Sequence, residues 1–251
     1  MKRAIVGLFT VLLLFAAVAS QAHDFNGEHL EYEFGWKGIP VAEAVVNINN
    51  RDCDGPCYRG TIDLQSKKYL DLIWKVRDRF EMSCVKKDYS PRHFLFKQRE
   101  GRFELDTEIR LDKDAGLLKS TRYRVDKNKP YRSKKAPAKE MFCPLSALLY
   151  MRSRPLNVGD TESIQVFDGK RIHNLQWSVS GKEKVTIGLG QFDSLKVLPK
   201  ITRSNEKDNE SKVEKVRTVV LWISDDPSHT ILKIESEVFV GSVYAELVKK
   251  N

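Results

Sequence analysis

The stretch Phe103-Glu-Leu-Asp-Thr-Glu-Ile-Arg-Leu-Asp112 places apolar side chains and one threonine at every second position, with charged residues between them. A period of two is typical of a β-strand with one face in the core and the other in water. Asp112-Lys-Asp-Ala-Gly116 then supplies a turn, and Leu117–Val125 runs back as the next strand. The segment therefore predicts an antiparallel hairpin.

The register of this hairpin decides which charges meet. If Leu111 lies opposite Leu117, Asp106 falls opposite Arg122 and Glu104 opposite Arg124. Residues directly opposite each other in an antiparallel pair share one face of the sheet. We therefore expect cross-strand ion pairs on the outer face.

Short apolar segments separated by turn residues recur along the rest of the chain and predict further strands. Pro144-Leu-Ser-Ala-Leu-Leu-Tyr-Met-Arg-Ser153 instead combines helix formers with a proline at its start, which predicts a helix. Lys127–Glu140 has no apolar period and predicts a loop, whereas the apolar Lys68–Trp74 fits either a short helix or a crossover. The further expected strands are Glu28–Trp36, Val41–Asn50, Cys57–Gln65, Val76–Val85, Ile164–Phe167, Arg171–Val179, Lys184–Ile187, Leu195–Ile201, Arg217–Ile223, Ile231–Val240 and Ser242–Leu247.

Together these segments predict a mainly β fold. We expect a curved, largely antiparallel sheet, or a partial or closed β-barrel, with one short helix near residues 144–153. The chain has 251 residues, is 41% hydrophobic and carries a formal net charge of +9. This composition excludes a disordered chain and a small disulfide-framework protein, and a single long apolar run excludes a polytopic membrane protein.

The N-terminal segment is typical of a secretory signal peptide. Lys2 and Arg3 precede an apolar run over residues 4–18, and small residues follow up to Ala22. We expect cleavage near Ala22, after which residues 23–251 form a single exported, periplasmic β-rich domain without a transmembrane span. An uncleaved N-terminal anchor is the alternative.

Export would place the four cysteines in an oxidising compartment. A Cys53–Cys57 bridge would staple the turn between them, and Cys84 with Cys143 would close a long loop. Four cysteines allow three pairings, so this one is a preference. The spacing of Cys53 and Cys57 also suits metal ligation or redox exchange, but no second cysteine pair or nearby histidine completes a zinc site. The histidines form no local metal-binding motif, and we expect no metal and no cofactor.

Several segments, taken in order, resemble the domain-of-unknown-function family 3108. That resemblance implies an exported bacterial envelope protein with one β-rich domain and no established catalytic residues. The segments are Gly35–Ala44, Val76–Glu81, Lys97–Arg102, Pro144–Tyr150 with Leu156–Asp160, and Leu221–Asp226 leading to Gly241–Leu247.

Two groups of basic residues are candidate binding residues. Arg77 and Arg79 would share a strand face and clamp an anionic ligand, unless neighbouring carboxylates occupy them. Residues 119–139 hold nine Lys or Arg and one acid, Asp126. Such a segment suits anionic lipid, lipopolysaccharide or acidic glycan, while a solvated loop is the alternative. The candidates in this segment are Lys127, Lys129, Arg132, Lys134 and Lys135.

No catalytic set is visible, because nucleophile-elbow, P-loop and dinucleotide-binding motifs are absent from the sequence. We expect a non-enzymatic envelope protein that binds an amphiphilic or anionic envelope component or scaffolds an envelope protein, and export disfavours nucleic acid. An envelope hydrolase whose site is assembled from distant residues is the alternative. A deep pocket with converging carboxylates or histidines would favour the hydrolase, and an apolar concave sheet a carrier.

Overall fold

Hydrogen-bonded ladders join sixteen strands of the described chain into one sheet. The computed structural model describes residues 23–52, 55–204, 219–237 and 242–251. Across the sheet the order is β10-β11-β12-β13-β14-β15-β16-β1-β2-β3-β4-β5-β6-β7-β8, and β9 also pairs with β7. The ladders are antiparallel apart from β10 with β11, and none within the described ranges joins β10 to β8 or β9. The sheet is therefore open, as a partial barrel requires.

The bounds of the elements follow the expected segments closely, because the alternation of apolar and polar residues marks most of the strands. The N-terminal elements are β1 (Glu28–Trp36), β2 (Ile39–Asp52), β3 (Pro56–Ser66), the 3-10 helix η1 (Lys68–Leu70), β4 (Arg77–Val85), β5 (Pro91–Glu100), β6 (Phe103–Asp112), β7 (Leu117–Arg124), β8 (Lys129–Pro130), β9 (Lys134–Pro137) and β10 (Met141–Phe142). The C-terminal elements are α1 (Pro144–Ser153), β11 (Thr161–Phe167), β12 (Ile172–Ile187), β13 (Gly190–Arg203), β14 (Val219–Ser224), β15 (Ile231–Glu237) and β16 (Ser242–Lys250).

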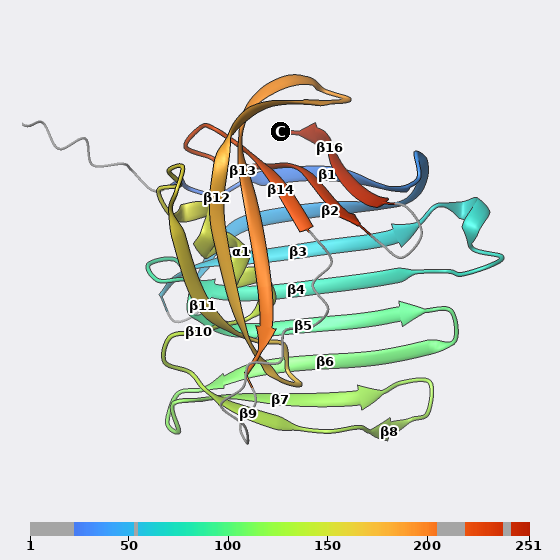
Figure 1. The fold of residues 1–251 in the computed structure, drawn as a ribbon. Coiled ribbons are helices and arrows are strands. Elements are labelled where there is room, and N and C mark those ends of the chain that lie inside the picture. The colour runs from blue at the N-terminus through green and yellow to red at the C-terminus, as the bar shows by residue number, and fades with distance from the viewer. Residues whose placement is uncertain (1–22, 53–54, 205–218, 238–241) are drawn as a thin grey trace, which may run out of the picture.

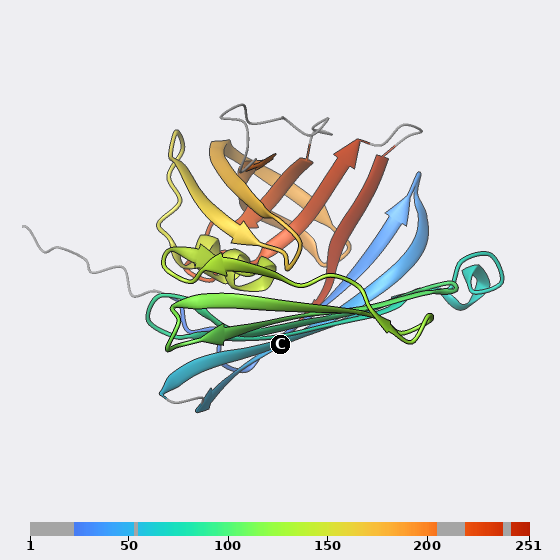
Figure 2. The ribbon, with the colours of Figure 1, turned by 90° about the horizontal axis from the view of Figure 1, so that it is seen from below.

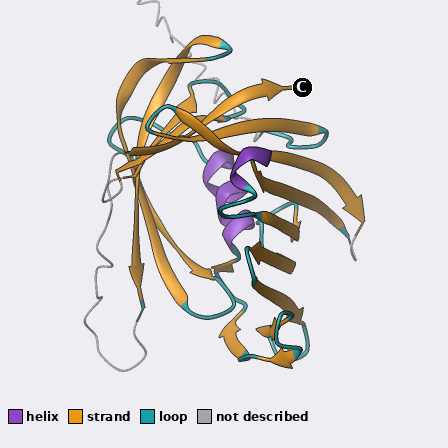
Figure 3. Ribbon diagram, turned by 90° about the vertical axis from the view of Figure 1, so that its right-hand side faces the viewer, coloured by secondary structure: helices purple, strands orange, loops and turns teal. Residues whose placement is uncertain are grey.

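The sheet folds back on itself into two layers. Strands β1–β8 form one layer and β11–β15 the other, and the paired strands β16 and β1 join the two (Figures 1 and 2). Helix α1 lies between the layers at one end (Figures 2 and 3). Around α1 the core includes Phe25, Tyr58 and Trp177, all at most 1% exposed. A second cluster, with Leu30 and Leu247, lies where the layers meet.

Helix α1 spans the residues that the sequence predicts. Pro144 occupies the first turn, and Cys143 caps the helix: its Sγ accepts a hydrogen bond from the Ser146 backbone N–H at 3.5 Å, and its own N–H donates to Ser146 Oγ at 3.1 Å. The predicted Cys84–Cys143 disulfide is wrong, because both residues are buried free thiols. Burial raises the pKa of both thiols, and the Cys143 sulfur is engaged in the cap.

Two predicted features of the N-terminal part of the chain lie outside the described residues. The predicted signal peptide and Cys53 lie outside these ranges, so the cleavage and the Cys53–Cys57 bridge stay predictions.

The prediction of a loop over residues 127–140 is wrong in part, because this segment contains the short strands β8 and β9. These short strands pair with β7 through backbone hydrogen bonds, which need no apolar side-chain pattern.

The β6–β7 register differs from the prediction by one residue. Asp112 pairs with Leu117 across a four-residue loop, so Arg122 lies opposite Thr107 rather than Asp106. A slip of one residue moves each side chain to the other face of the sheet. Arg122 is therefore buried, with Nε donating to Thr107 Oγ1 at 3.3 Å, and the predicted Asp106–Arg122 ion pair does not form. Arg124 lies opposite Leu105 and pairs with Asp126, so the predicted Glu104–Arg124 pair does not form either.

We expect Gly35→Ala to destabilise the fold by about 1–3 kcal/mol, the usual cost of overpacking. Gly35 pairs with Tyr244 across the β1–β16 junction, and a Cβ at Gly35 would overlap the Tyr244 ring. Gly181→Ala is the matched control, since a Cβ there meets nothing within 4 Å. Urea denaturation measures both variants, and equal midpoints would contradict this account of the junction.

Candidate functional site

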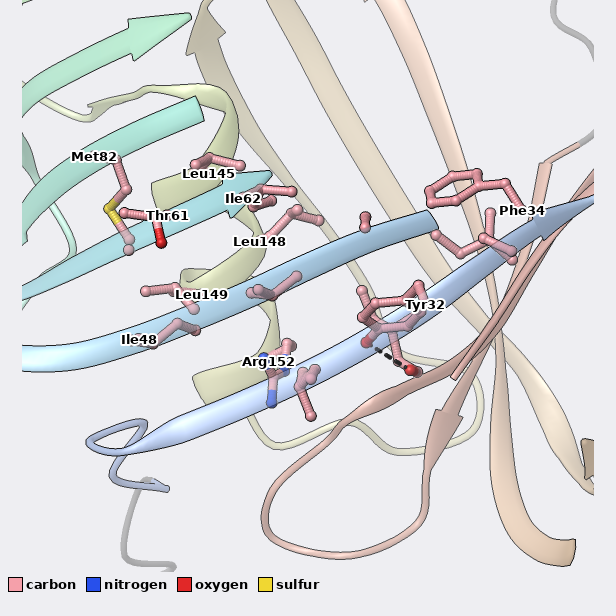
Figure 4. A pocket seen from close by; sticks show the side chains of 17 residues that line it. Tyr32, Phe34, Ile48, Thr61, Ile62, Met82, Leu145, Leu148, Leu149 and Arg152 are labelled. Carbon is pink, nitrogen blue, oxygen red and sulfur yellow. Dashed lines mark hydrogen bonds between the residues drawn. The ribbon is translucent and has the colours of Figure 1, made fainter. Parts of the chain in front are cut away.

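An apolar pocket lies between α1 and the inner face of the sheet. Its volume is about 160 Å³. Strands β1–β4, β15 and β16 form the wall opposite the helix (Figure 4). An engineered apolar cavity of about 150 Å³ stays dry and binds benzene. The pocket is thus large enough for a small apolar group.

The periodicities of helix and strand explain which side chains line the pocket. Helix α1 contributes Leu145, Leu148, Leu149 and Arg152, whose spacing places them on one helix face. Every second residue of a strand faces the same side, so β1 contributes Leu30, Tyr32 and Phe34, and β2 contributes Ala44, Val46 and Ile48.

A buried ion pair closes one side of the pocket. Arg152 Nη1 and Nη2 donate to the two carboxylate oxygens of Glu28 at 2.8 and 2.5 Å. Arg152 Nε donates to the His229 carbonyl at 2.9 Å, Nη2 also donates to the Ser228 carbonyl at 3.1 Å, and the guanidinium lies 4.8 Å from the Phe25 ring centroid. The charge is balanced and its donors are engaged, so Arg152 offers no free cation to a ligand.

Tyr32 is the other ionisable residue lining the pocket. Its hydroxyl donates to the Ile231 carbonyl at 2.9 Å (Figure 4), and burial raises its pKa, so the phenol stays neutral. Among the described residues that line the pocket there is no carboxylate, histidine or cysteine. The lining is therefore almost entirely apolar, and its hydroxyl groups are those of Tyr32 and Thr61.

A larger, polar hollow of about 680 Å³ lies outside α1, beside β10 and β11. Two of its carboxylates are already engaged. Glu162 accepts hydrogen bonds from the Tyr150 hydroxyl at 2.7 Å and from Arg154 Nε at 3.3 Å, and Asp88 accepts one from the Ser90 hydroxyl at 2.7 Å. The described residues contain no cluster of three or more metal-ligating side chains. Within these residues no helix is long and apolar enough to cross a bilayer.

The model of a family described as a protein of unknown function, DUF3108, matches residues 31–248. The chain belongs to this family. No protein of curated function matches its sequence.

Among solved structures, the DUF3108 chain is similar to a β-barrel-like protein of the domain of unknown function DUF1849 from Brucella abortus. Sequence identity is 10%, the TM-score is 0.55, and the match covers 91% of this chain and 98% of that one. An exported protein with a YmcC-like fold from Bacteroides fragilis matches at 10% identity with a TM-score of 0.39, covering 90% and 96%. A lipoprotein from Parabacteroides distasonis matches at 10% identity with a TM-score of 0.34, covering 90% and 95%. The first likeness shows that the two proteins share a fold.

The two candidate arginines of the DUF3108 chain lie next to each other on β4 but are held by carboxylates. Arg77 binds Asp71 through both terminal nitrogens, at 3.2 and 2.6 Å. Arg79 binds Asp63 at 2.6 Å and Glu81 at 2.9 Å. Both sets of contacts match the ion-pair alternative that the sequence leaves open.

The candidate basic residues of the other group lie at a sheet edge. Lys127 lies in the β7–β8 turn, Lys129 on β8, Arg132 between β8 and β9, and Lys134 and Lys135 on β9. All five are exposed, and none forms a salt bridge within the described chain. Exposed lysines on an edge strand also hinder edge-to-edge aggregation.

Sequence reasoning did not find the pocket. Its strand residues read as core positions, because a side chain that lines a small apolar cavity has the same period and polarity as one that fills the core. A detectable signal was the apolar stripe Leu145, Leu148 and Leu149, which shares one helix face with the charged Arg152.

We expect Glu28→Gln to destabilise the fold by about 3–5 kcal/mol, since it leaves the Arg152 charge buried without its partner. Both side chains of the pair are 5% exposed. The matched control is Asp193→Asn, whose partner Lys184 lies on the surface, with side chains 73% and 60% exposed. That control should change stability by less than about 1 kcal/mol. Equal effects in urea denaturation would contradict the structural role of the buried pair.

Proposed function

We propose that this chain is a non-enzymatic protein of the bacterial cell envelope that binds the hydrocarbon part of an amphiphile in the pocket beneath α1. The observation that carries the proposal is the predominantly apolar lining of the pocket of about 160 Å³, whose one charged side chain, Arg152, is paired with Glu28. Transfer of apolar surface from water into an apolar pocket lowers the free energy. A lining with few polar partners makes burial of a polar ligand unfavourable.

The expected signal peptide supports a location of the protein in the cell envelope. An exported protein meets lipids, lipopolysaccharide and glycans, and an amphiphile of that setting combines an apolar chain with an anionic head group. The pocket suits the chain. The exposed basic residues at the β8–β9 edge lie four strands from β4 in the sheet order and suit a separate contact with an anionic surface.

The pocket also argues for binding over the alternative of an envelope hydrolase. Hydrolysis needs an activated water or a nucleophile next to a general base. The ionisable residues lining the apolar pocket are Arg152 and Tyr32, and hydrogen bonds within the protein hold both.

We expect Ala44→Leu to lower the affinity for cis-parinaric acid at least about tenfold, because the added isopropyl group occupies volume that the end of the probe's hydrocarbon chain needs. Ala44 is 4% exposed and lines the pocket. Ala245→Leu fills the pocket from β16 and should act in the same way. The probe's fluorescence, with displacement by dodecanoate, measures affinity, and a urea midpoint confirms that each variant is folded.

The control for pocket filling is Ala115→Leu, in the exposed β6–β7 turn. It should bind like the wild type. Undiminished binding by both folded pocket variants would exclude the pocket as the ligand site.

We expect charge reversal at Lys129, Lys134 and Lys135 to weaken association with anionic vesicles about a hundredfold at low salt. Each lysine near an anionic surface contributes about 1 kcal/mol, and about 1.4 kcal/mol is a factor of ten. The control is charge reversal at Lys170, Lys182 and Lys184, which changes the net charge of the protein by the same amount but lies on and next to β12 rather than on the β8–β9 edge. Vesicle sedimentation measures both, and equal losses would mean that net charge alone governs the association.

A further inference from the structure

The connection between β3 and β4 carries exposed apolar side chains that neither the core nor the pocket uses. Leu72 is 96% exposed, Ile73 86%, Trp74 60% and Tyr69 56%. The connection, which includes η1, projects beyond the end of the sheet (Figures 1 and 2). Water-exposed leucine, isoleucine and tryptophan in sequence are unusual in a soluble domain and mark an interaction site.

The connection is held in its shape by polar contacts at its base. Asp71 accepts two hydrogen bonds from the Arg77 guanidinium and one from the Ser66 hydroxyl at 2.7 Å. The Trp74 N–H donates to the Leu70 carbonyl at 2.8 Å, and the Gly101 N–H donates to the Lys75 carbonyl at 2.7 Å. Arg77 therefore positions the connection, and its apolar side chains are presented on an ordered backbone.

The β1–β2 turn extends this apolar surface. Trp36 is 41% and Ile39 54% exposed. The Lys67 N–H donates to the Val41 carbonyl at 2.9 Å, and the Tyr69 hydroxyl donates to the Pro40 carbonyl. The two connections are therefore contiguous. We name their exposed residues the apolar tip: Trp36, Ile39, Tyr69, Leu72, Ile73 and Trp74.

Basic side chains surround the apolar tip. Lys68 and Lys75 flank the connection, and Arg102 lies in the β5–β6 turn, next to Gly101, whose Cβ position is 3.8 Å from Trp74 Cδ1. All three are exposed, and none forms a salt bridge within the described residues. The nearby Asp71 is paired with Arg77. Glu100, which pairs with Val76 and accepts a hydrogen bond from Gln98, is another carboxylate at this place, so the rim of the tip carries a net positive charge around an apolar centre.

We propose that the apolar tip inserts into the interface of a lipid bilayer that contains anionic lipids. Tryptophan and tyrosine favour the head-group region, where one end of the ring is apolar and the other wet. Leucine and isoleucine reach the acyl chains, and lysine and arginine extend to the phosphates. A protein partner would need a complementary surface, whereas a bilayer accepts this combination of aromatic, aliphatic and basic residues without one.

The test is sedimentation of the full chain with vesicles of phosphatidylcholine and phosphatidylglycerol. We expect Leu72→Asp/Ile73→Asp to lower the partition constant at least about a hundredfold, since each apolar side chain withdrawn from water contributes roughly a factor of ten or more. Both side chains are almost fully exposed, so the fold should be retained. The matched control is Val158→Asp/Leu189→Asp, at two exposed positions outside the tip, and it should bind like the wild type.

Insertion depth gives a second, independent readout. Lipids brominated on the acyl chain should quench tryptophan emission of the wild type. Trp36→Phe/Trp74→Phe should remove most of that quenching, because Trp177 is buried in the core and Trp222 lies on β14, where its indole N–H donates to Glu183 Oε1. Vesicle binding by the Asp variant at the wild-type level would overturn the proposal, and so would wild-type binding without quenching. A concentration-dependent dimer that the Asp substitutions abolish, without vesicle binding, would assign the tip to a second copy and also overturn it.

The vesicle test is independent of ligand binding in the pocket. A protein whose tip inserts but whose pocket stays empty would refute the proposed function alone. Binding of cis-parinaric acid without vesicle association would refute the tip, together with the vesicle contact expected of the β8–β9 edge, and would leave the pocket as the ligand site.

Discussion

The Glu28–Arg152 ion pair is the contact on which the pocket depends. It joins β1 to α1 across 124 residues of sequence, in a region where both side chains are 5% exposed. Taking two charges out of water costs several kcal/mol each, which the interaction offsets when the geometry is bidentate and the remaining donors are satisfied. The His229 and Ser228 carbonyls meet that requirement. The pair thereby fixes the position of α1 over the inner face of the sheet and leaves the pocket between them without a free charge.

Much of the fold follows from local sequence, and the site does not. The period of two in residues 103–112 predicts β6, and Pro144 followed by helix formers predicts α1, because local geometry determines both. The β6–β7 register depends on how the Asp112–Gly116 turn closes, and a difference of one residue buries Arg122 instead of exposing it. The pocket depends on the distance between elements far apart in sequence. No local pattern distinguishes a side chain beside a cavity from one in a filled core.

The structure gives different roles to charges that look alike in the sequence. Arg152 neutralises a buried carboxylate, Arg77 holds the β3–β4 connection through Asp71, and Lys68 and Lys75 stay in water beside apolar side chains. The net charge of +9 is therefore not one binding surface. The basic residues that form no salt bridge within the described chain include those at the β8–β9 edge and those at the rim of the apolar tip. The apolar pocket and the proposed bilayer contact of the tip both fit the proposed function of binding an amphiphile.

Native mass spectrometry of the mature protein, purified from periplasm without detergent, tests the central claim most directly. The proposed function predicts a mass increment that corresponds to a bound acyl-bearing amphiphile, is released on denaturation and is absent from Ala44→Leu. The same spectrum tests the expected cleavage near Ala22. The bare mass of the chain, with no lipid in its organic extract and no adduct after incubation with dodecanoate, would contradict the claim that the pocket binds hydrocarbon.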